Sequence, residues 1–463
     1  MTCDCDDGYT SGAASRGVRP ERNLHAMISK SKKHMVLTTF MLPAGYHKDS
    51  WRMPGSRADE LGNLDFVADL TLMAEAAKLD AVFFGDIVHA NTVLRGDIKM
   101  NGFYEPMTVL SALAARTKNI GLIGTMSTSF SEPYNVARQL CGLDHMSNGR
   151  AGWNIVTSSD GFQNYGVSDV PDPAVRYRRA TEFVDVVQKL WDSWGDDAVI
   201  VDKENSEYVD RSKLRAINHQ GEFFNVQGPI NMPRSPQGRP VLVQAGSSGP
   251  GMDLGSSVAD GIYTAQPFKE PSVEFYAKFK AMAAEKGRHP DDVKVIPGIL
   301  PILGDTEKEA GDLADELANY VHLENGRAQV AADLKMDLSE LDFNDRIPAA
   351  WFSDDPKLGS RYQIYRKKSV DMGMTLRELI VDLARSTGHQ WMAGTPSQVA
   401  DRMVDWFESK ACDGFNLNAP FNPGGFKLIC EKLVPELQDR GYFRSEYEGT
   451  TLRDNLGLSR PGA

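Results

Sequence analysis

Eight short apolar segments alternate with amphipathic segments along this 463-residue chain, and this alternation limits the possible folds more than any other feature. The apolar segments have the length of strands, and most of the intervening segments repeat apolar residues at helical spacing. Strands that alternate with helices predict a parallel sheet. The expected strands are residues 36–42, 81–85, 120–125, 149–158, 240–244, 261–265, 293–303 and 414–418.

The alternation alone does not decide whether this sheet is open or closed into a barrel. A chain of this length can form one α/β barrel with insertions. No Gly-x-Gly-x-x-Gly motif follows any of the expected strands, so the sequence does not indicate a resident nicotinamide site.

Polar residues directly follow several of the expected strands. The fourth segment ends in Asn154, Thr157, Ser158 and Ser159, and Asp86 follows the second. A barrel of this class forms its site at the C-terminal ends of its strands, so these residues are candidates for ligand binding. The alternatives are that the fourth tip is an ordinary polar loop and that Asp86 is a helix cap or fixes a loop.

The segment Ala-Gly-Ser-Ser-Gly-Pro, residues 245–250, joins the fifth expected strand to a helix. Free N–H groups and the positive end of the helix dipole attract anions at such a position. The segment therefore predicts a site for a terminal phosphate, and the alternative is a plain serine-capped helix.

Seven segments, taken in order, resemble the bacterial-luciferase-like flavin monooxygenases. The closer resemblance is to the branch with the nitrilotriacetate, EDTA, dibenzothiophene sulfone and long-chain alkane monooxygenases. The segments are Phe83-Phe-Gly-Asp86, Gly149-Arg-Ala-Gly-Trp-Asn-Ile-Val-Thr-Ser158, Arg176-Tyr177, Gln244-Ala-Gly-Ser-Ser248, Gly394-Thr-Pro396, Asp413-Gly-Phe-Asn-Leu417 and Val434-Pro-Glu-Leu-Gln-Asp-Arg-Gly441. The resemblance implies a (β/α)8 TIM barrel with luciferase-like insertions.

The expected domain organisation is a single TIM barrel over residues 36–445. Two stretches without a clear helical or strand period, near 196–238 and 327–389, are expected to be insertions, the first with a small hairpin. The second is long, charged and aromatic, which is typical of a lid over an active site, and an oligomer contact is the alternative. Residues 1–35 are expected to be a disordered tail, and residues 446–463 are a candidate for contact with a neighbouring subunit.

The resemblance implies a two-component FMNH2-dependent monooxygenase. A separate NAD(P)H-dependent flavin reductase supplies FMN as reduced FMNH2, O2 is the co-substrate, and a C4a-peroxyflavin transfers one oxygen atom to a small organic substrate. Within the same superfamily, the alternatives are an oxidoreductase that uses the deazaflavin F420 and a flavin-binding protein without turnover. The substrate itself cannot be read from the sequence, because loops that differ between relatives form its pocket.

The resemblance also implies which residues lie near the flavin ring, near the FMN phosphate and near the substrate. Residues expected near the flavin are Asp86, Thr125, Asn154, Ser158, Ser159 and Tyr177, and residues expected around the FMN phosphate are Ala245, Gly246, Ser247 and Ser248. Residues expected near the substrate are His47, Trp51, Asn91 and His389. Relatives carry a histidine or tyrosine at four positions that differ here: Asn91, Ser159, Pro173 and Gln329. No catalytic residue or proton relay is therefore assigned.

Composition excludes several other classes of protein. The net charge of −12 argues against a nucleic-acid partner. No apolar run is long enough for a membrane span, and the first 35 residues lack the apolar region of a secretory signal, so none is expected. The five cysteines are expected to be reduced thiols, and Cys3-x-Cys5 has no second ligand pair, so no metal site is expected. We expect a cytoplasmic homo-oligomer, a dimer or a tetramer.

The first 26 residues are expected to contribute little. They are polar and rich in small residues, and the resemblance begins only near Val36. Deleting residues 1–26 should leave FMNH2 affinity and the melting temperature unchanged, which flavin titration and thermal unfolding can measure. A large decrease in either quantity would contradict this expectation.

Overall fold

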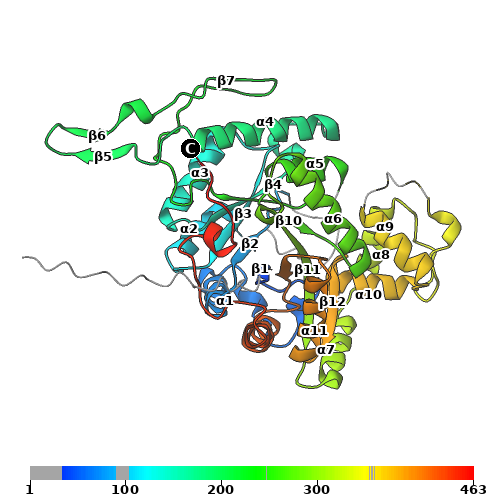
Figure 1. The fold of residues 1–463 in the computed structure, drawn as a ribbon. Coiled ribbons are helices and arrows are strands. Elements are labelled where there is room, and N and C mark those ends of the chain that lie inside the picture. Colours follow the sequence, from blue (N-terminus) through cyan, green and yellow to red (C-terminus); the bar gives the residue numbers. More distant parts are fainter. Residues whose placement is uncertain are drawn as a thin grey trace, which may run out of the picture. The chain divides into compact units, whose positions relative to one another are not determined.

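The computed structural model describes residues 34–89, 104–246, 248–353, 355, 358 and 360–462. Eight parallel strands form its centre, and neighbours in the ring pair in the order β10, β9, β4, β3, β2, β1, β13, β11. The pairing of β10 with β11 closes the ring, which confirms the predicted (β/α)8 barrel (Figure 1). The strands are β1 (Val36–Phe40), β2 (Ala81–Phe84), β3 (Gly121–Ser127), β4 (Ala151–Val156), β9 (Val241–Gln244), β10 (Gly261–Thr264), β11 (Lys294–Leu303) and β13 (Gly414–Leu417).

Helices follow the barrel strands and pack around them. They are α1 (Leu64–Ala76), α2 (Pro106–Ala114), α3 (Pro133–Met146), α4 (Pro173–Trp191), α5 (Gly249–Val258), α6 (Lys269–Glu285), α7 (Glu307–Asn319) and α11 (Pro396–Glu408). The chain then continues through α12 (Gly424–Leu428), a π-helical turn (Ile429–Leu433) and α13 (Val434–Asp439). Proline at the first turn begins several of these helices, where its missing N–H costs nothing. No helix in the described ranges is long and apolar enough to cross a membrane.

A ninth strand, β12 (Gln390–Gly394), pairs with β11 outside the ring and was not expected. Its sequence, Gln-Trp-Met-Ala-Gly, is short and only partly buried, so it lacks the apolar run that marks the barrel strands. The expected insertion over residues 327–389 ends just before it.

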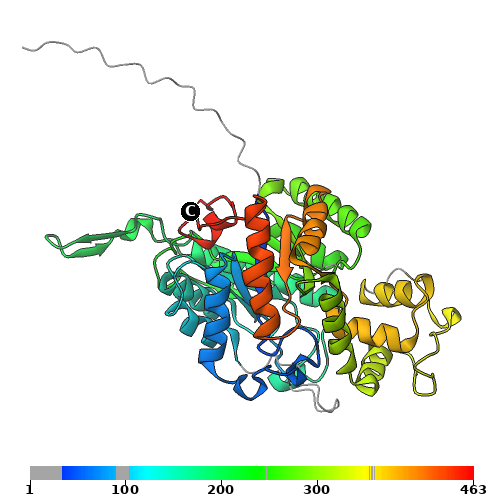
Figure 2. The ribbon, with the colours of Figure 1, turned by 90° about the horizontal axis from the view of Figure 1, so that it is seen from below.

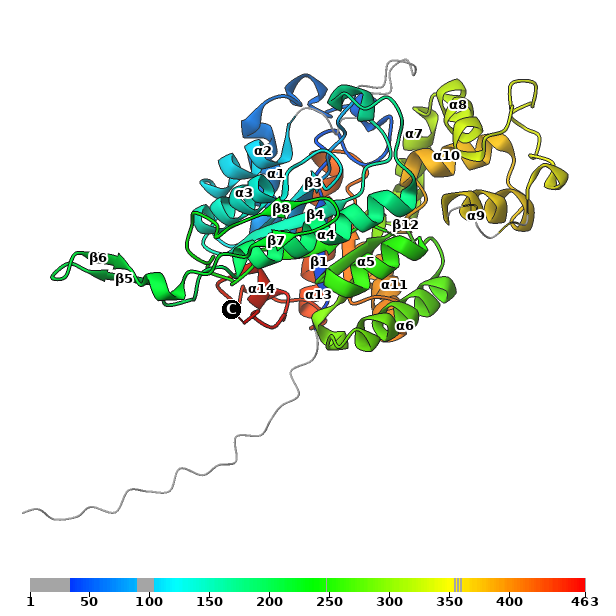
Figure 3. The ribbon, with the colours of Figure 1, turned by 90° about the horizontal axis from the view of Figure 1, so that it is seen from above.

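The first expected insertion contains two hairpins rather than one. Strand β5 (Val199–Asp202) pairs with β6 (Glu207–Val209), and β7 (His219–Gln220) pairs with β8 (Asn225–Val226). The β5–β6 hairpin projects away from the barrel in all three ribbon views (Figures 1, 2 and 3).

The second expected insertion is a helical unit on the opposite side of the barrel from that hairpin (Figure 3). It contains α8 (Leu323–Leu334), a short turn (Ala349–Trp351), α9 (Ser360–Arg366), a π-helical turn (Lys367–Asp371) and α10 (Leu376–Ser386). Its helices share a hydrophobic cluster of their own, which includes Leu334, Tyr362, Leu379 and Ile380. The insertion is therefore an ordered unit with its own core.

The C-terminal tail folds back on its own barrel, and its expected contact with a neighbouring subunit stays a prediction. Helix α14 (Leu452–Asn455) and the residues after it place Leu452, Leu456 and Leu458 in one buried cluster with barrel residues such as Val36 and Ile123. A Cβ at Gly121 would lie 2.4 Å from Leu452 Cδ1, so the start of β3 leaves room for this leucine. The tail closes the barrel at the N-terminal ends of its strands.

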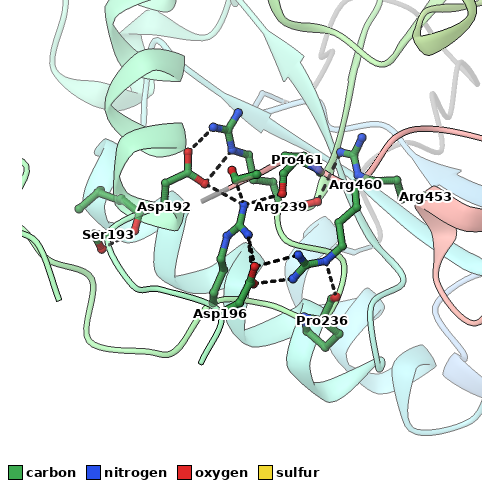
Figure 4. A network of polar contacts seen from close by, with 11 residues as sticks. Asp192, Ser193, Asp196, Pro236, Arg239, Arg453, Arg460 and Pro461 are labelled. Atoms are coloured by element: carbon green, nitrogen blue, oxygen red, sulfur yellow. Dashed lines mark hydrogen bonds and ion pairs between the residues drawn. The ribbon is translucent and has the colours of Figure 1, made fainter. Parts of the chain in front are cut away.

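Arginine–aspartate pairs hold the tail in place. Arg453 donates to Asp260 with a 2.9 Å Nη2–Oδ2 distance, and both side chains are largely buried. Figure 4 shows Arg460 paired with Asp196, which begins the first insertion. Arg234, near the end of that insertion, donates to the carbonyl oxygens of Pro461 and Gly462 at 2.8 and 2.7 Å. The tail thus ties together the two ends of the hairpin insertion.

Cys141, Cys412 and Cys430 are buried free thiols, as predicted. Residues 1–33 of the tail that was expected over residues 1–35, with Cys3 and Cys5, lie outside the described residues. Met35 is already buried at the start of the barrel.

Candidate functional site

A cavity of about 420 Å³ opens at the C-terminal ends of the barrel strands, which is a typical volume for a small-molecule pocket. Barrel strands and the second insertion line it together. The lining residues are Phe40, Tyr46, Phe83, Gly85, Asp86, Thr125, Asn154, Val156, Ala245, Gly246, Tyr263, Thr264, Ala265, Arg361, Ile364, Tyr365, Thr387, Gly388, His389, Asn416 and Asn418. Six residues predicted for the site are among them: Asp86, Thr125, Asn154, Ala245, Gly246 and His389.

The neighbouring ends of β3 and β4 present an oriented amide. The Thr125 hydroxyl donates to the Phe84 carbonyl at 2.9 Å and accepts from Asn154 Nδ2 at 2.9 Å. These two bonds hold the amide with its Oδ1 buried and without a partner among the described residues. A buried, unpaired acceptor in a cavity is costly unless a ligand donates to it, so this atom indicates a binding site.

Ser158 and Tyr177 lie beside this cavity and do not line it. The Ser158 hydroxyl is 2.7 Å from that of Ser127, and Arg176 donates to the Ser158 carbonyl at 2.7 Å. Ser159 is exposed beyond them. These contacts hold the loop after β4, and Arg176 on α4 takes part in them.

Asp86 lies in the loop after β2, where it is partly buried. Burial raises the pKa of its carboxyl, and the negative charge of Glu105 raises it further, while the Ile87 backbone N–H lowers it. A partly buried carboxyl of this kind can accept hydrogen bonds from a ligand.

The N-terminus of α5 lies where the sequence predicts an anion cradle, and Ser248 is its N-cap. The Ser248 hydroxyl accepts from the Gly251 N–H at 3.3 Å and lies 3.4 Å from the Tyr177 hydroxyl. A Cβ at Gly251 would lie 3.1–3.2 Å from Ser248 Oγ, Gly246 Cα and the Tyr177 hydroxyl, so glycine keeps this corner open. Since Gly246 also lines the cavity, the cradle is continuous with it. Ser247 lies outside the described residues.

The structure does not bring every predicted substrate residue to the cavity. The Tyr46 and His47 N–H groups donate to the Ala419 and Pro420 carbonyls, so this loop runs along the segment after β13. Tyr46 lines the cavity, whereas His47 is buried and is not among the lining residues, and Trp51 packs against the main core. Asn91 lies outside the described residues.

Residues of the last barrel strand were missed by the sequence analysis. Thr38 donates to Asn416 Oδ1 at 2.8 Å, and Asn416 donates to Asn418 Oδ1 at 3.2 Å. The chain of bonds leaves Asn418 Nδ2 buried and without an acceptor. Two asparagines at alternate positions of Asp-Gly-Phe-Asn-Leu-Asn were the available signal, because alternate residues of a strand face the same side.

The buried histidines make stability depend on pH. Burial lowers the pKa of His47 to about 3, and the positive charges of Arg385 and Lys48 act in the same direction. Burial likewise lowers the pKa of His389 to about 4, with Arg361 adding to the effect. Both imidazoles are therefore neutral at pH 7 in the folded protein.

We expect the apoprotein to lose stability as the pH falls below about 6.5, and His47→Asn to reduce that loss. In the unfolded chain, histidine binds a proton near its ordinary pKa of about 6.5, whereas folded His47 does not bind one until its much lower pKa is reached. As the pH falls from about 6.5 towards that lower pKa, protonation therefore favours the unfolded chain, and the free energy of unfolding decreases. At pH 5 the contribution of one such histidine is about 2 kcal/mol. Urea unfolding at pH 7 and pH 5 measures the effect, and an unchanged difference between the two pH values in the variant would contradict it.

No cluster of histidine, cysteine and acidic side chains that could hold a metal ion occurs in the described part of the chain. What the cavity offers is a partly buried carboxyl, unpaired amide atoms, aromatic walls and an anion cradle at one end.

Comparisons with known proteins identify similar sequences and structures. Residues 38–412 match the model of the luciferase-like monooxygenase family. N-acetyl-S-(2-succino)cysteine monooxygenase of Bacillus subtilis is 42% identical, over 94% of this chain and 99% of that protein. Component A of nitrilotriacetate monooxygenase from Aminobacter aminovorans is 37% identical, over 93% and 98%. The solved structure of EDTA monooxygenase from Chelativorans sp. BNC1 superposes with a TM-score of 0.77 at 32% identity, over 92% and 99%.

Proposed function

This chain belongs to the luciferase-like monooxygenase family, and from that premise we propose how its own residues serve the reaction. It is a flavin-dependent monooxygenase, the oxygenase component of a two-component system, as its relatives are. We propose that FMN in its reduced form, FMNH2, binds in the cavity above the barrel. When bound, the reduced flavin supplies the electrons that activate O2 for transfer of one oxygen atom to the substrate.

The observation that carries this proposal is the unpaired Asn154 Oδ1 inside a cavity that continues into the α5 cradle. A flavin has both a heterocyclic ring with N–H and carbonyl groups and a terminal phosphate. The cavity's amide acceptor suits the first, and the helix N-terminus suits the second. The residues present therefore fit FMN.

Specific residues take separate roles in the proposed site. Thr125 fixes the Asn154 amide towards the ring, and Asp86 offers a carboxylate acceptor at the end of β2. Ser248 and Tyr177, with the free N–H groups at the start of α5, hold the phosphate. No residue is assigned as a proton relay. The neutral side chains of His389 and Tyr46 lie on the cavity wall, with their ring centroids 5.7 Å apart.

The second insertion is proposed to shield the bound cofactor. Arg361, Ile364 and Tyr365 of α9, with the segment 387–389, contribute one side of the cavity. Excluding water during turnover prevents loss of reducing equivalents as hydrogen peroxide. The position of these residues on the cavity wall supports the lid role. It does not require the alternative, in which the insertion contacts another subunit.

We propose a separate NAD(P)H-dependent flavin reductase as the partner protein. We also propose that the chain associates with further copies of itself as a homo-oligomer. Component A in the name of the nitrilotriacetate relative denotes one part of such a system. No nucleic acid or membrane partner is proposed.

The test combines the chain with a purified flavin reductase, NADH, FMN and 18O2. The substrate panel comprises N-acetyl-S-(2-succino)cysteine, nitrilotriacetate, dibenzothiophene sulfone and dimethyl sulfide, the compounds in the names of four relatives. Incorporation of one 18O atom into a substrate is expected. Turnover only with reduced deazaflavin F420 would favour the hydride-transfer alternative, and tight FMN binding with no turnover would favour a binding protein.

A further inference from the structure

We propose that the substrate carries a carboxylate and that Arg361, on α9 of the second insertion, binds it at the cavity wall. The inference rests on the proposed function, because it names the substrate class of the same site. It also makes Arg361 a specificity-determining residue that the sequence analysis did not single out.

Arg361 is the one Lys or Arg among the described residues that line the cavity. Its side chain is 57% exposed, and it pairs with Asp333 at 3.6 Å between Nη1 and Oδ1. Asp333 also accepts from the Tyr365 hydroxyl at 2.6 Å and from Gln329 Nε2 at 3.0 Å. Because two other donors serve this carboxylate, Arg361 can turn to a ligand without leaving Asp333 unpaired.

Two described groups of the cavity wall that respond to the charge of Arg361 are themselves neutral at neutral pH. Its positive charge helps to lower the pKa of His389, which lies near 4, and it opposes the rise in the pKa of Tyr46 to about 12. Both side chains are therefore neutral. Asp86 is the one carboxylate on the described lining, and the main charge that shifts its pKa is that of Glu105. Apart from its ion pair with Asp333, the Arg361 guanidinium is available to an anionic group of a ligand.

A second observation points to the same ligand chemistry. Asn418 is 1% exposed and lines the cavity, and its Nδ2 donor has no acceptor. A buried donor without an acceptor is costly, and a ligand oxygen removes that cost. A guanidinium fork with an amide donor on the same cavity suits a carboxylate, which can accept bidentate bonds and has lone pairs to spare.

The FMN phosphate is the other oxyanion available to Arg361, and the experiment has to separate the two sources. The α5 cradle already offers backbone N–H groups and the Ser248 and Tyr177 hydroxyls to a phosphate. We therefore assign the substrate carboxylate, and not the phosphate, to Arg361.

The test compares acids with their methyl esters as substrates of the complete two-component enzyme. The probes are N-acetyl-S-(2-succino)cysteine and nitrilotriacetate, each beside its trimethyl ester, with wild type, Arg361→Gln and Arg361→Lys. We expect Arg361→Gln to lower kcat/KM for an acid at least tenfold, mainly through KM, and to change the ester less than threefold. Arg361→Lys should fall between wild type and Arg361→Gln, since it keeps the charge but loses the planar fork.

A matched control and a flavin titration complete the design. Arg377→Gln removes an exposed arginine from α10 of the same insertion that does not line the cavity, and it should leave all four probes unaffected. FMN and riboflavin affinities should be the same in Arg361→Gln as in wild type. A selective loss of FMN affinity would assign Arg361 to the phosphate and overturn the proposal.

Two other outcomes would also overturn it. Equal effects of Arg361→Gln on kcat/KM for the acid and for its ester would show that the guanidinium does not bind a carboxylate. A wild-type preference for the esters, or for dibenzothiophene sulfone, would show the same. Failure of the wild type to oxygenate any compound in the panel would instead contradict the proposed monooxygenase function, and the carboxylate inference would fall with it.

Discussion

Replacing Ser248 with aspartate is expected to weaken FMN binding by about 100-fold or more, which corresponds to about 3 kcal/mol. Ser248 is the N-cap of α5, and its hydroxyl faces the Gly251 N–H and the Tyr177 hydroxyl. A carboxylate there would lie beside the phosphate and would also occupy the N–H groups that the phosphate needs. Repulsion between the two anions at a distance of about 4 Å is large even where the effective dielectric constant is high.

Aspartate is itself a preferred N-cap, so the substitution should leave α5 intact. Ser248→Asn provides the matched control, because asparagine also caps helices and carries no charge. Fluorescence titration of FMN and of riboflavin measures the effect, and riboflavin binding should change far less than FMN binding. If both flavins lost affinity equally, or if FMN affinity were unchanged, the phosphate would not bind at this helix.

Leu452→Ala is expected to lower the free energy of unfolding by about 2–5 kcal/mol, the usual cost of deleting most of a buried leucine. Leu452 is fully buried and closes the barrel at the N-terminal ends of its strands, against Gly121 and the cluster that contains Val36 and Ile123. The loss includes a cavity between the tail and the barrel floor, which the closed ring of strands cannot collapse to fill.

Leu72→Ala is the control, because Leu72 on α1 is 41% exposed and the same chemical change there should cost little. Urea unfolding of both variants measures the difference. If Leu452→Ala were as stable as Leu72→Ala, the tail would contribute no packing to the isolated chain. The tail would then be free to serve as the intersubunit contact that the sequence analysis considered.

The eight barrel strands could be predicted because each is a short, continuous apolar run bounded by turn residues. Strand β12 could not, because Gln-Trp-Met-Ala-Gly has neither an apolar run nor strict alternation. It is a strand because the exposed edge of β11 pairs with it, and that pairing is a tertiary interaction. The same limit applies to the tail, whose leucines are too few to reveal which surface they cover.

The candidate site divides in the same way. Asp86, Thr125, Asn154, Ala245 and Gly246 could be placed from sequence, because they sit at strand ends and the C-terminal ends of parallel strands converge. Which way a loop side chain points could not be predicted. Tyr46 and His47 are adjacent and both suit a pocket, but only Tyr46 lines the cavity, and the path of this loop along residues 419–420 is a tertiary contact.

The sequence by itself determined the alternation of strands and helices and the polar strand tips, because these depend on local periodicity and on residues close together in the chain. Closure into a barrel followed from the resemblance, and the pairing of β10 with β11 shows it. Only the tertiary structure decided that Arg361 and Asn418 share a cavity, since one comes from an insertion helix and the other directly follows the last barrel strand. It also decided that the tail closes the barrel of its own chain. Contacts between residues far apart in the chain depend on how the elements pack, and no local pattern encodes that packing.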